Sequence, residues 1–435
     1  MEFTLVQLTD ALKISFRADE MSLLFAALTT VMWLLVGIYS FGYMAHDEHK
    51  KRYGFFYILV YFVLLGLDFS ANLITMYLFY EFMTLCSMPM IIHEMKEESI
   101  SAAMKYLYYS IAGAFLALFG IFVLSQYAPS MDFVAGGSMT AVEIPHKGLI
   151  LAGVFLMILG FGAKAGMFPL HAWLPIAHPV APAPASAVLS GVITKSGVLA
   201  IIRVVFYIVG ADVIRGSWVQ TAWMVLALLT IIMGSARAYD EKVLKKRLAY
   251  STVSQVSYVL FGLSTLHPMG VTGALLQVIF HSTSKNLLFM GAGSVIHQTG
   301  KTKVTELRGI GRSMPITLGC FTFAALSLVG IPPFAGFFSK WYLANGSLSC
   351  GIAGFSWAGP VVLLLSALLT AGYLFPIFVQ GFLPGKELDK EASKKCEAGL
   401  NMTIPMMILA ALTLALGVFS TGIIEALAQL TAKLM

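Results

Sequence analysis

Charged residues and cysteines are both scarce in this sequence. Only 11% of the 435 residues are Asp, Glu, Lys or Arg, and 58% are apolar, whereas an ordinary soluble domain carries about 25% charged residues. This shortage of charge excludes a soluble globular protein. The four cysteines, Cys86, Cys320, Cys350 and Cys396, are far apart and form no CxxC or Cys/His cluster. We therefore expect no iron–sulfur centre, no structural zinc and no cofactor in this chain, and assign any redox chemistry to partners.

Long apolar runs fill most of the chain. Since a membrane-spanning helix needs about 20 residues, the sequence has room for about a dozen spans but not for a separate catalytic domain, so we expect no active site of its own. The runs predict an all-α polytopic membrane protein with twelve transmembrane helices. The predicted spans are Glu20–Met44, Tyr53–Asp68, Ser70–His93, Ser101–Gln126, Lys147–Phe168, Val180–Val209, Trp218–Ser235, Leu248–Thr265, Gly270–His297, Met314–Asn345, Pro360–Leu383 and Met402–Ala428.

The distribution of basic residues predicts the orientation. If the sides alternate through twelve spans, eighteen of the 28 lysines and arginines fall in loops on one side and five on the other. Loops rich in Lys and Arg face the cytoplasm. Both termini are therefore expected on the outer side of a prokaryotic cell membrane. The net charge of +6 would suggest nucleic acid in a soluble protein, but for a chain within the lipid bilayer no nucleic-acid partner is expected.

Clusters of glycine and proline interrupt two of the predicted helices. They lie at the end of the fifth span, over Gly160–Pro169, and in the middle of the tenth span, over Gly330–Gly336. Such breaks free backbone polar groups that lipid cannot satisfy. The two broken helices are therefore expected to face protein or water.

Five basic residues and one deep acid lie inside the apolar spans, where a charge costs roughly 2.5–3.5 kcal/mol at the bilayer centre. Arg203, about two turns from the end of its span, is expected to snorkel to the surface. The others are candidates for function: Glu81, Lys164, Lys195, Lys285 and Lys340. A single lysine could hold Glu81 for packing alone. One carboxylate cannot neutralise four lysines, however, so some must be neutral or solvated by water, which is typical of a proton relay.

Three histidines are further candidates. His171 and His178 lie in Phe168–Ser186, where five prolines predict a stiff loop at the membrane edge. This loop is expected either to admit protons or to be purely structural, and it has no Cys, Asp or Glu to complete a metal site. His281 precedes Lys285 by four residues and so shares its helical face. A lone helix histidine is usually a packed residue, but beside Lys285 it is predicted to join the relay.

Several motifs together resemble one family. The sequences GFGAKAGMFPLHAWLPIAHP (160–179) and SGVITKSG (190–197) resemble the signature of the antiporter-like subunits of respiratory complex I, energy-converting and membrane-bound hydrogenases, and Mrp-type cation/proton antiporters. The motifs KKRLAYSTVSQ (245–255), HSTSKNLLF (281–289) and GIPPFAGFFSK (330–340) extend the resemblance in chain order. It covers almost the whole sequence.

The resemblance implies two inverted five-helix repeats, each with a broken helix. The implied division is an N-terminal segment and first helix at 1–52, repeats at 53–210 and 211–385, and a C-terminal loop and last helix at 386–435. The resemblance also implies the role of each buried charge. It makes Glu81 the partner of Lys164, makes Lys195 and Lys285 a central relay with His281, and makes Lys340 the terminal residue.

The chain departs from the family pattern at several points. It is expected to lack the family's first two helices and its long C-terminal lateral helix. Gln277 stands where some members carry a second histidine, and Ile176 stands where Asp is usual. A relay with two histidines is therefore not expected.

The family implies a proton-translocating subunit of a redox-driven complex, an ion-translocating oxidoreductase. Its partners would be other membrane subunits and hydrophilic subunits carrying iron–sulfur clusters. Two alternatives stay open: a subunit of a multisubunit sodium/proton antiporter without redox partners, and a structural membrane subunit that moves no ion. The sequence does not separate the first two, and it does not say whether protons or sodium ions move.

Overall fold

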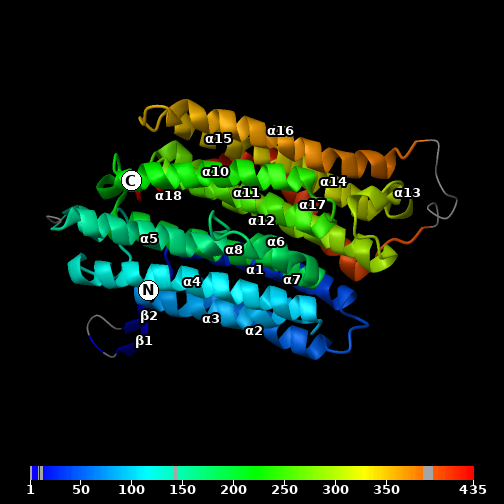
Figure 1. The fold of residues 1–435 in the computed structure, drawn as a ribbon, viewed down its shortest axis with the longest axis horizontal. Coiled ribbons are helices and arrows are strands. Elements are labelled where there is room, and N and C mark those ends of the chain that lie inside the picture. Colours follow the sequence, from blue (N-terminus) through cyan, green and yellow to red (C-terminus); the bar gives the residue numbers. More distant parts are fainter. Residues whose placement is uncertain (1, 8, 10–12, 142–144, 386–394) are drawn as a thin grey trace.

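The computed structural model describes residues 2–7, 9, 13–141, 145–385 and 395–435. Long helices lie side by side along the molecule, and the described chain begins and ends at the same end of the bundle (Figure 1). A two-stranded antiparallel hairpin, β1 (Glu2–Gln7) and β2 (Lys13–Arg17), precedes the helices at that end. The first helices are α1 (Glu20–Tyr43), α2 (Lys50–Asp68), α3 (Leu73–Ile91) and α4 (Glu97–Tyr127).

The first broken helix follows. Helix α5 (Lys147–Ala165) stops at Gly166, whose φ of +79° only glycine adopts readily. A short helix α6 (Trp173–Val180) follows the break. The predicted stiff loop at the membrane edge is therefore wrong, because the proline-rich segment is largely helical and much of it is buried. Pro175 lies in the first turn of α6, where a missing N–H leaves no helix hydrogen bond unmade.

The next crossing is the most buried one. Its consecutive pieces are α7 (Ala183–Val188), the π-helical η2 (Leu189–Ile193), α8 (Thr194–Ile202) and the π-helical η3 (Arg203–Val209). All of its residues are buried inside the protein. Lys195 is therefore carried on a helix that has protein on every side.

The second set of helices has a similar order. It comprises α9 (Ala211–Ile214), α10 (Trp218–Asp240), α11 (Leu244–Ser264), α12 (Pro268–Thr299), α13 (Ile310–Ser313), α14 (Pro315–Val329), α15 (Gly336–Leu348) and α16 (Phe355–Phe382). The break between α14 and α15 begins at Gly330, with φ +92°. The chain ends with α17 (Leu400–Val418) and α18 (Ser420–Ala432), and the 3₁₀ turns η1 (Ser138–Ala141) and η4 (Val304–Glu306) lie in connections.

These helices confirm a polytopic all-α membrane fold. Eight described segments are long and apolar enough to cross a bilayer. Helices α2, α11 and α12, of 19, 21 and 32 residues, and the broken pair α14 and α15 bring the number of crossings to the predicted twelve. The broken helix is the fourth crossing in both 53–210 and 211–385, in keeping with the implied repeats, whose boundaries stay a prediction.

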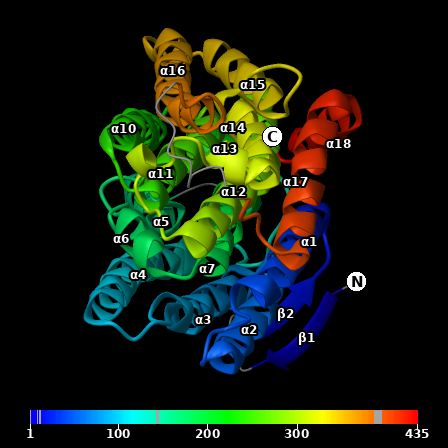
Figure 2. The ribbon, with the colours of Figure 1, turned by 90° about the vertical axis from the view of Figure 1, so that its right-hand side faces the viewer.

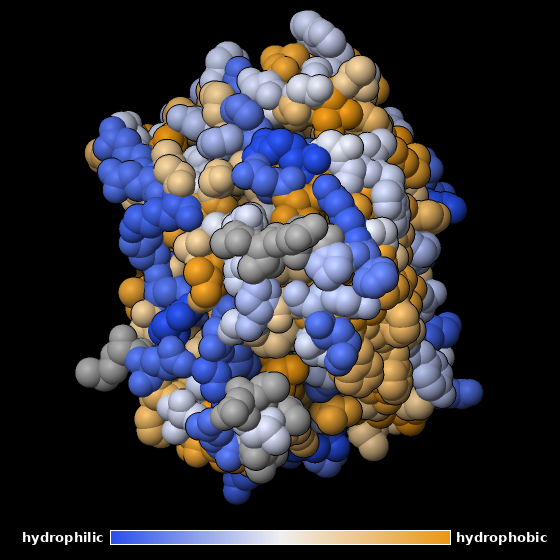
Figure 3. Space-filling model, turned by 90° about the vertical axis from the view of Figure 1, so that its left-hand side faces the viewer, coloured by the Kyte–Doolittle hydropathy of each residue, from blue (hydrophilic) through white to orange (hydrophobic). Residues whose placement is uncertain are grey.

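The outside of the bundle suits lipid. Large apolar side chains are more than half exposed along its flanks, among them Phe55, Phe62, Phe115, Leu364 and Leu368. Hydrophilic residues gather instead on the end that carries both termini (Figure 3). A molecule with apolar flanks and polar ends is what a bilayer requires.

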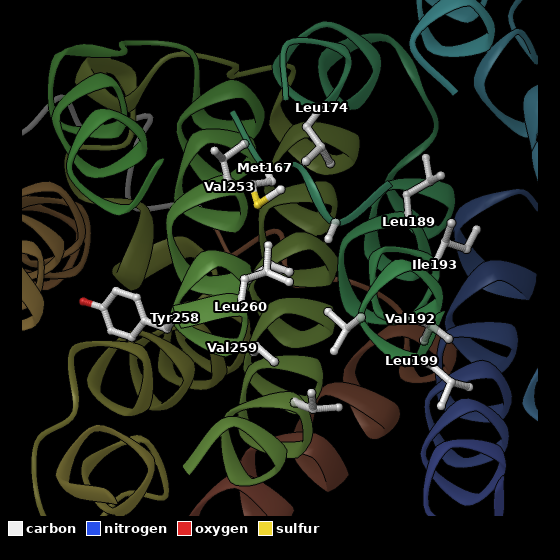
Figure 4. Packing of buried hydrophobic residues seen from close by; sticks show 14 of the residues in the cluster. Met167, Leu174, Leu189, Val192, Ile193, Leu199, Val253, Tyr258, Val259 and Leu260 are labelled. Carbon is white, nitrogen blue, oxygen red and sulfur yellow. The ribbon is translucent and has the colours of Figure 1, made fainter. Parts of the chain in front are cut away.

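Helices α11 and α12 run through the middle of the bundle (Figure 2). Apolar side chains such as Leu260 of α11 and Ile193 of η2 fill the space between these elements (Figure 4). Tyr258 points to the opposite side of α11 (Figure 4). Polar residues in this region are therefore buried beside apolar side chains.

Candidate functional site

The predicted relay residues form two clusters. Glu81 on α3 and Lys164 on α5 interact electrostatically in the first. The second contains Lys195 on α8, His281 and Lys285 on α12, and Lys340 on α15, with His281 interacting with all three lysines. Between the clusters α5 and α8 touch at Gly197, where an added Cβ would lie 3.2 Å from the Cβ of Lys164.

Three hydroxyl groups surround Lys164. Its Nζ donates to Thr84 Oγ1 at 2.9 Å, to the Tyr106 hydroxyl at 2.8 Å and to Ser110 Oγ at 2.9 Å. It also lies 4.3 Å from the centroid of the Tyr106 ring. A lysine ammonium has three donors, so this fully buried site matches the charged form. The last turn of α5, where Lys164 lies, is the negative end of that helix.

Glu81 does not pair directly with Lys164. The described structure has no ion pair between them within 4.0 Å, and the half-buried Glu81 has one carboxylate oxygen, Oε1, that is buried without a hydrogen-bond partner. The resemblance implied a pair, but the geometry shows only an interaction at longer range. The physical reason is that hydroxyls from α3 and α4 already occupy all three donors of Lys164.

The second cluster is built on a direct contact between Lys195 and His281. Lys195 Nζ lies 2.7 Å from His281 Nδ1 and also donates to Ser190 O at 2.6 Å and Thr194 Oγ1 at 3.3 Å. We expected His281 beside Lys285, which lies one helical turn away. The hydrogen-bonded neighbour of His281 is instead Lys195, because the imidazole points across to α8.

His281 also lines a tight gap. Nε2 is buried and has no hydrogen-bond partner. If Nδ1 accepts from the Lys195 ammonium, the imidazole proton sits on Nε2. His281, Ser284, Ser327 and Lys340 line this gap, which is too narrow to hold a water molecule. The His281 imidazole can take up a proton at one nitrogen and release a proton from the other. It therefore lies between Lys195 and Lys340 as a group that could transfer protons.

Lys285 has fewer acceptors than Lys164. Its Nζ donates to Leu248 O at 3.0 Å and to Ser251 Oγ at 2.7 Å. Two donor hydrogens and a free lone pair describe a neutral amine, so this buried site suits the uncharged form. Thr252 Oγ1 also donates to Leu248 O, at 3.0 Å, and lies 2.7 Å from Ser190 Oγ. These hydroxyls connect Lys285 to the residue that accepts from Lys195.

Lys340 binds the end of the second broken helix. Its Nζ donates to Leu328 O at 2.6 Å, one of the last carbonyls of α14, and lies 5.7 Å from the Tyr258 ring centroid. The final carbonyls of a helix have no partner within it and carry its negative dipole end. A Cβ on Gly330 would lie 3.0 Å from Lys340 Nζ. The break therefore creates both the acceptor and the space for the lysine.

Gln277 takes part in a network without titratable groups. Its Nε2 donates to Gln255 Oε1 at 2.9 Å, and its Oε1 accepts from Ser339 Oγ at 2.6 Å. This network links α11, α12 and α15 beside the gap. An amide can orient neighbours, but it does not take up protons at working pH.

The two histidines of the proline-rich segment have different surroundings. His171 is half-buried and stacks on Phe168, with ring centroids 5.9 Å apart. His178 is fully buried, stacks on Phe289 at 4.7 Å, and has no hydrogen-bond partner at either ring nitrogen. No three His, Cys, Asp or Glu side chains gather around a common point in the described part of the chain.

Arg203 does not snorkel to the surface. It is 1% exposed and binds both carboxylate oxygens of Asp19, at 2.7 and 2.9 Å. The partner lies 184 residues away, so spacing gave no sign of it. Burial alone would raise the pKa of the Asp19 carboxyl. Hydrogen bonds from Arg203 and Ser22 outweigh this effect, so the pKa of Asp19 is lowered. Asp68, buried near Arg203 with Thr29 Oγ1 at 3.0 Å, was also not predicted from the sequence.

The comparisons with known proteins agree with the fold. The family described as NADH:quinone oxidoreductase/Mrp antiporter, transmembrane, matches residues 70–370, and the N-terminal family of complex I chain 5 matches residues 7–54. An NADH-quinone oxidoreductase subunit of Desulforudis audaxviator, of the N type, is 33% identical over 90% of this chain and 79% of its own length. A Na(+)/H(+) antiporter subunit of Bacillus subtilis is 29% identical over 92% and 80%.

Hydrogenase-4 component B of Escherichia coli is 29% identical over 92% of this chain, which spans only 61% of that relative. Among solved structures, the Mrp complex from Dietzia sp. DQ12-45-1b matches with a TM-score of 0.87 and 21% identity, covering 100% of this chain and 87% of the other. The archaeal membrane-bound sulfane sulfur reductase matches with a TM-score of 0.86 and 22% identity, covering 99% and 85%. Both structures share the fold.

Proposed function

We propose that this chain, which belongs to the NADH:quinone oxidoreductase/Mrp antiporter family, is an antiporter-like proton-translocating subunit of a multisubunit membrane complex. The observation that carries the proposal is the contact between the buried side chains of Lys195 and His281, with Lys285 and Lys340 around it. Ionisable residues placed at such cost within a membrane protein mark ion pathways.

In the proposed relay, Lys195 passes a proton to Nδ1 of His281, and the imidazolium releases a proton from Nε2 towards Lys340. Neutral imidazole accepts at one nitrogen while it carries a proton on the other, so this transfer needs no rotation of the ring. The gap that His281 and Lys340 line is closed to water in this structure. The last step therefore requires the gap to widen, which makes it the gate of the relay.

Lys285 supplies protons to Lys195 in this scheme. Its lone pair is free to accept one, and the hydroxyls of Ser190 and Thr252 lie between the two lysines. Positive charge on either lysine disfavours charge on the other. A proton arriving at Lys285 therefore promotes the departure of the proton on Lys195.

The first cluster acts as a charge switch. Lys164 is held as an ammonium by three hydroxyls, and the unpartnered oxygen of Glu81 leaves that carboxylate free to change its partner. Loss or gain of charge at Glu81 alters how strongly Lys164 is held. Through the close packing of α5 on α8 at Gly197, this change reaches the helix that carries Lys195.

The proposed partners are further membrane subunits and hydrophilic redox subunits with iron–sulfur clusters, since the relatives include a subunit of an NADH-quinone oxidoreductase. The proposed location is the cell membrane of a prokaryote with both termini outside, supported by the excess of Lys and Arg in the loops at the opposite side. The chain itself needs no cofactor in this scheme, because the partners carry the electrons.

The second candidate is a sodium/proton antiporter subunit without redox partners. The likeness to the Bacillus subtilis antiporter subunit over most of both chains favours it. Copurification separates the two: iron–sulfur or nickel-containing hydrophilic subunits support the first candidate, and small membrane subunits alone support the second. A structural subunit that moves no ion is the third outcome.

The test uses membrane vesicles that carry the protein in its complex, with a dye that reports internal pH. A pulse of electron donor or a sodium gradient energises the vesicles. We expect Lys340→Ala to abolish proton translocation and Lys340→Glu to retain part of it, because a carboxylate can also titrate at that place. Wild-type translocation by Lys340→Ala, with normal assembly, would refute the proposed function.

A further inference from the structure

His178 is a buried titratable group that the relay described above does not use. It lies at the C-terminal end of α6, is fully buried, and has no partner for Nδ1 or Nε2. An unsatisfied buried polar group costs about 1–3 kcal/mol, so a packed histidine normally finds at least one hydrogen bond. The ring stacks on Phe289, one helical turn after Lys285, and His178 interacts electrostatically with both Lys245 and Lys285.

Lys245 is equally unexpected. The sequence places it in a run of three basic residues at the start of α11 and counts it as a loop cation, yet it is only 8% exposed. Its Nζ donates to Pro179 O at 3.2 Å and to Ala181 O, the backbone on either side of the end of α6. It is thus anchored to the residue that directly follows His178.

A pocket connects this lysine with the outside of the bundle. It has a volume of about 120 Å³, enough for a few waters, and lies among the ends of α1, α6 and α12 and the start of α11. Glu94 and Lys245 are its charged residues, and Tyr43 and Thr302 add polar atoms to its wall. The pocket opens at the end of the bundle opposite the chain termini, where the basic loops gather.

We propose that this pocket is the proton inlet and that Lys245 and His178 carry protons from it to Lys285. The inference rests on the proposed function and adds the route of uptake. The Lys245 ammonium gives a proton to one ring nitrogen of His178, the imidazolium gives the proton on its other nitrogen to the neutral amine of Lys285, and water in the pocket reprotonates Lys245. Each step moves one proton and creates no other product.

The positions of the charges fit this route. The carboxylate of Glu94 attracts protons and other cations to the pocket. The positive charge of Lys245 repels cations, but a proton can still move inward because the lysine passes on its own proton and is reprotonated from the pocket. Lys285 makes two donor contacts and keeps a lone pair free. His171 differs from His178, because it is half-buried beside Phe168 and the charge that acts on it is that of Arg237. The structure therefore favours His178 over His171 as the inlet histidine.

The first test compares His178→Phe with His49→Phe in vesicles that carry the intact complex. Phenylalanine keeps the stack on Phe289 but cannot take up a proton, so we expect translocation to fall by at least roughly tenfold, as when a proton-transferring group is lost. His49 is exposed at the same end of the bundle, and its variant should match the wild type. Full translocation by correctly assembled His178→Phe would overturn the inlet and make His178 a packing residue.

A second test blocks the pocket from outside and does not depend on the packing of the core. In a background without native cysteines, Glu94→Cys and Glu97→Cys are each treated with a charged, membrane-impermeant methanethiosulfonate. Both side chains are exposed at the same end, but only Glu94 lines the pocket. We expect the reagent to suppress translocation in the Glu94 variant alone. Equal rates in the two labelled variants would overturn the inlet.

Lys285→Met separates this inference from the proposed function. If Lys285→Met stops translocation while His178→Phe and the labelled Glu94→Cys variant do not, the relay stands and its inlet lies elsewhere. If Lys285→Met translocates normally, the proposed function itself fails.

Discussion

Lys195 Nζ lies 2.7 Å from His281 Nδ1, inside a core that the rest of the bundle seals from water. A lysine ammonium and a histidine imidazolium cannot both exist at this distance, since like charges at hydrogen-bonding range disfavour each other strongly. One proton is therefore shared between them. This is the arrangement that a transfer step needs, and it links the two halves of the chain.

Removal of one hydroxyl from the Lys164 cage should slow translocation. Tyr106→Phe deletes one of three acceptors of a buried ammonium, a contact worth about 1.5–3 kcal/mol, and leaves a donor unpaired. We expect a marked fall in translocation with the fold retained. Tyr108→Phe on the same helix is the control, because Tyr108 is 61% exposed. Equal rates in the two variants would contradict the role of the cage.

Glu81→Gln should leave the protein assembled but impair translocation. No ion pair is lost, because the carboxylate does not contact Lys164, so the melting temperature should change little. The charge that Lys164 senses disappears, and the switch should fail. Glu97→Gln, exposed at the start of α4, should behave like the wild type. Undiminished proton translocation by Glu81→Gln would show that this acid is structural.

Gly330→Ala tests the geometry of the second broken helix. A residue other than glycine in the left-handed region costs roughly 1–2 kcal/mol, and the new Cβ would displace Lys340 from Leu328 O. We expect lower stability and loss of translocation. Gly319→Ala in α14 meets nothing within 4 Å and should keep activity, with stability equal or slightly higher. Normal translocation by both variants would show that the break does not position Lys340.

The Asp19–Arg203 pair should make stability depend on pH in the acid range. The pKa of Asp19 is lowered in the folded protein, so its contribution is fully present above the ordinary value of 3.8 and is lost as pH falls through the lower folded value. The melting temperature in detergent should therefore drop below about pH 3.8 in the wild type. In Asp19→Asn this component should be absent, and the protein should be less stable at neutral pH by about 3 kcal/mol. Identical acid profiles would contradict the assignment.

The sequence predicted the twelve crossings, the two breaks and the buried lysines, because apolar length and misplaced charge are local signals. It did not predict what each lysine touches. The acceptors of Lys164 come from two other helices, and hydroxyls on apolar helices carry no pattern of their own. The likeness to the family named the residues and implied that Glu81 pairs with Lys164. The two residues interact electrostatically, but the described structure has no ion pair between them within 4.0 Å.

Other errors have equally specific causes. Arg203 was expected to snorkel because its acid lies far away in the sequence, just before α1. Lys245 was counted with the loops because helix starts are poorly marked, and nothing local shows that the end of α6 covers it. Proline density predicted a loop at 168–186, but prolines near a helix end are tolerated. In each case the structure differs from the prediction because of burial or of a contact with a residue far away in the sequence, and neither is visible in the local sequence.

The central claim is that protons pass from Lys195 through His281, and His281→Gln tests it most directly. Glutamine can still accept a hydrogen bond from Lys195, so the fold should survive, but it cannot take a proton at one atom and release it from another. His297→Gln, exposed near the end of the same helix, is the matched control. In vesicles that carry the assembled complex, we predict that His281→Gln abolishes proton translocation and His297→Gln preserves it. Translocation at the wild-type rate by His281→Gln would contradict a relay through this histidine.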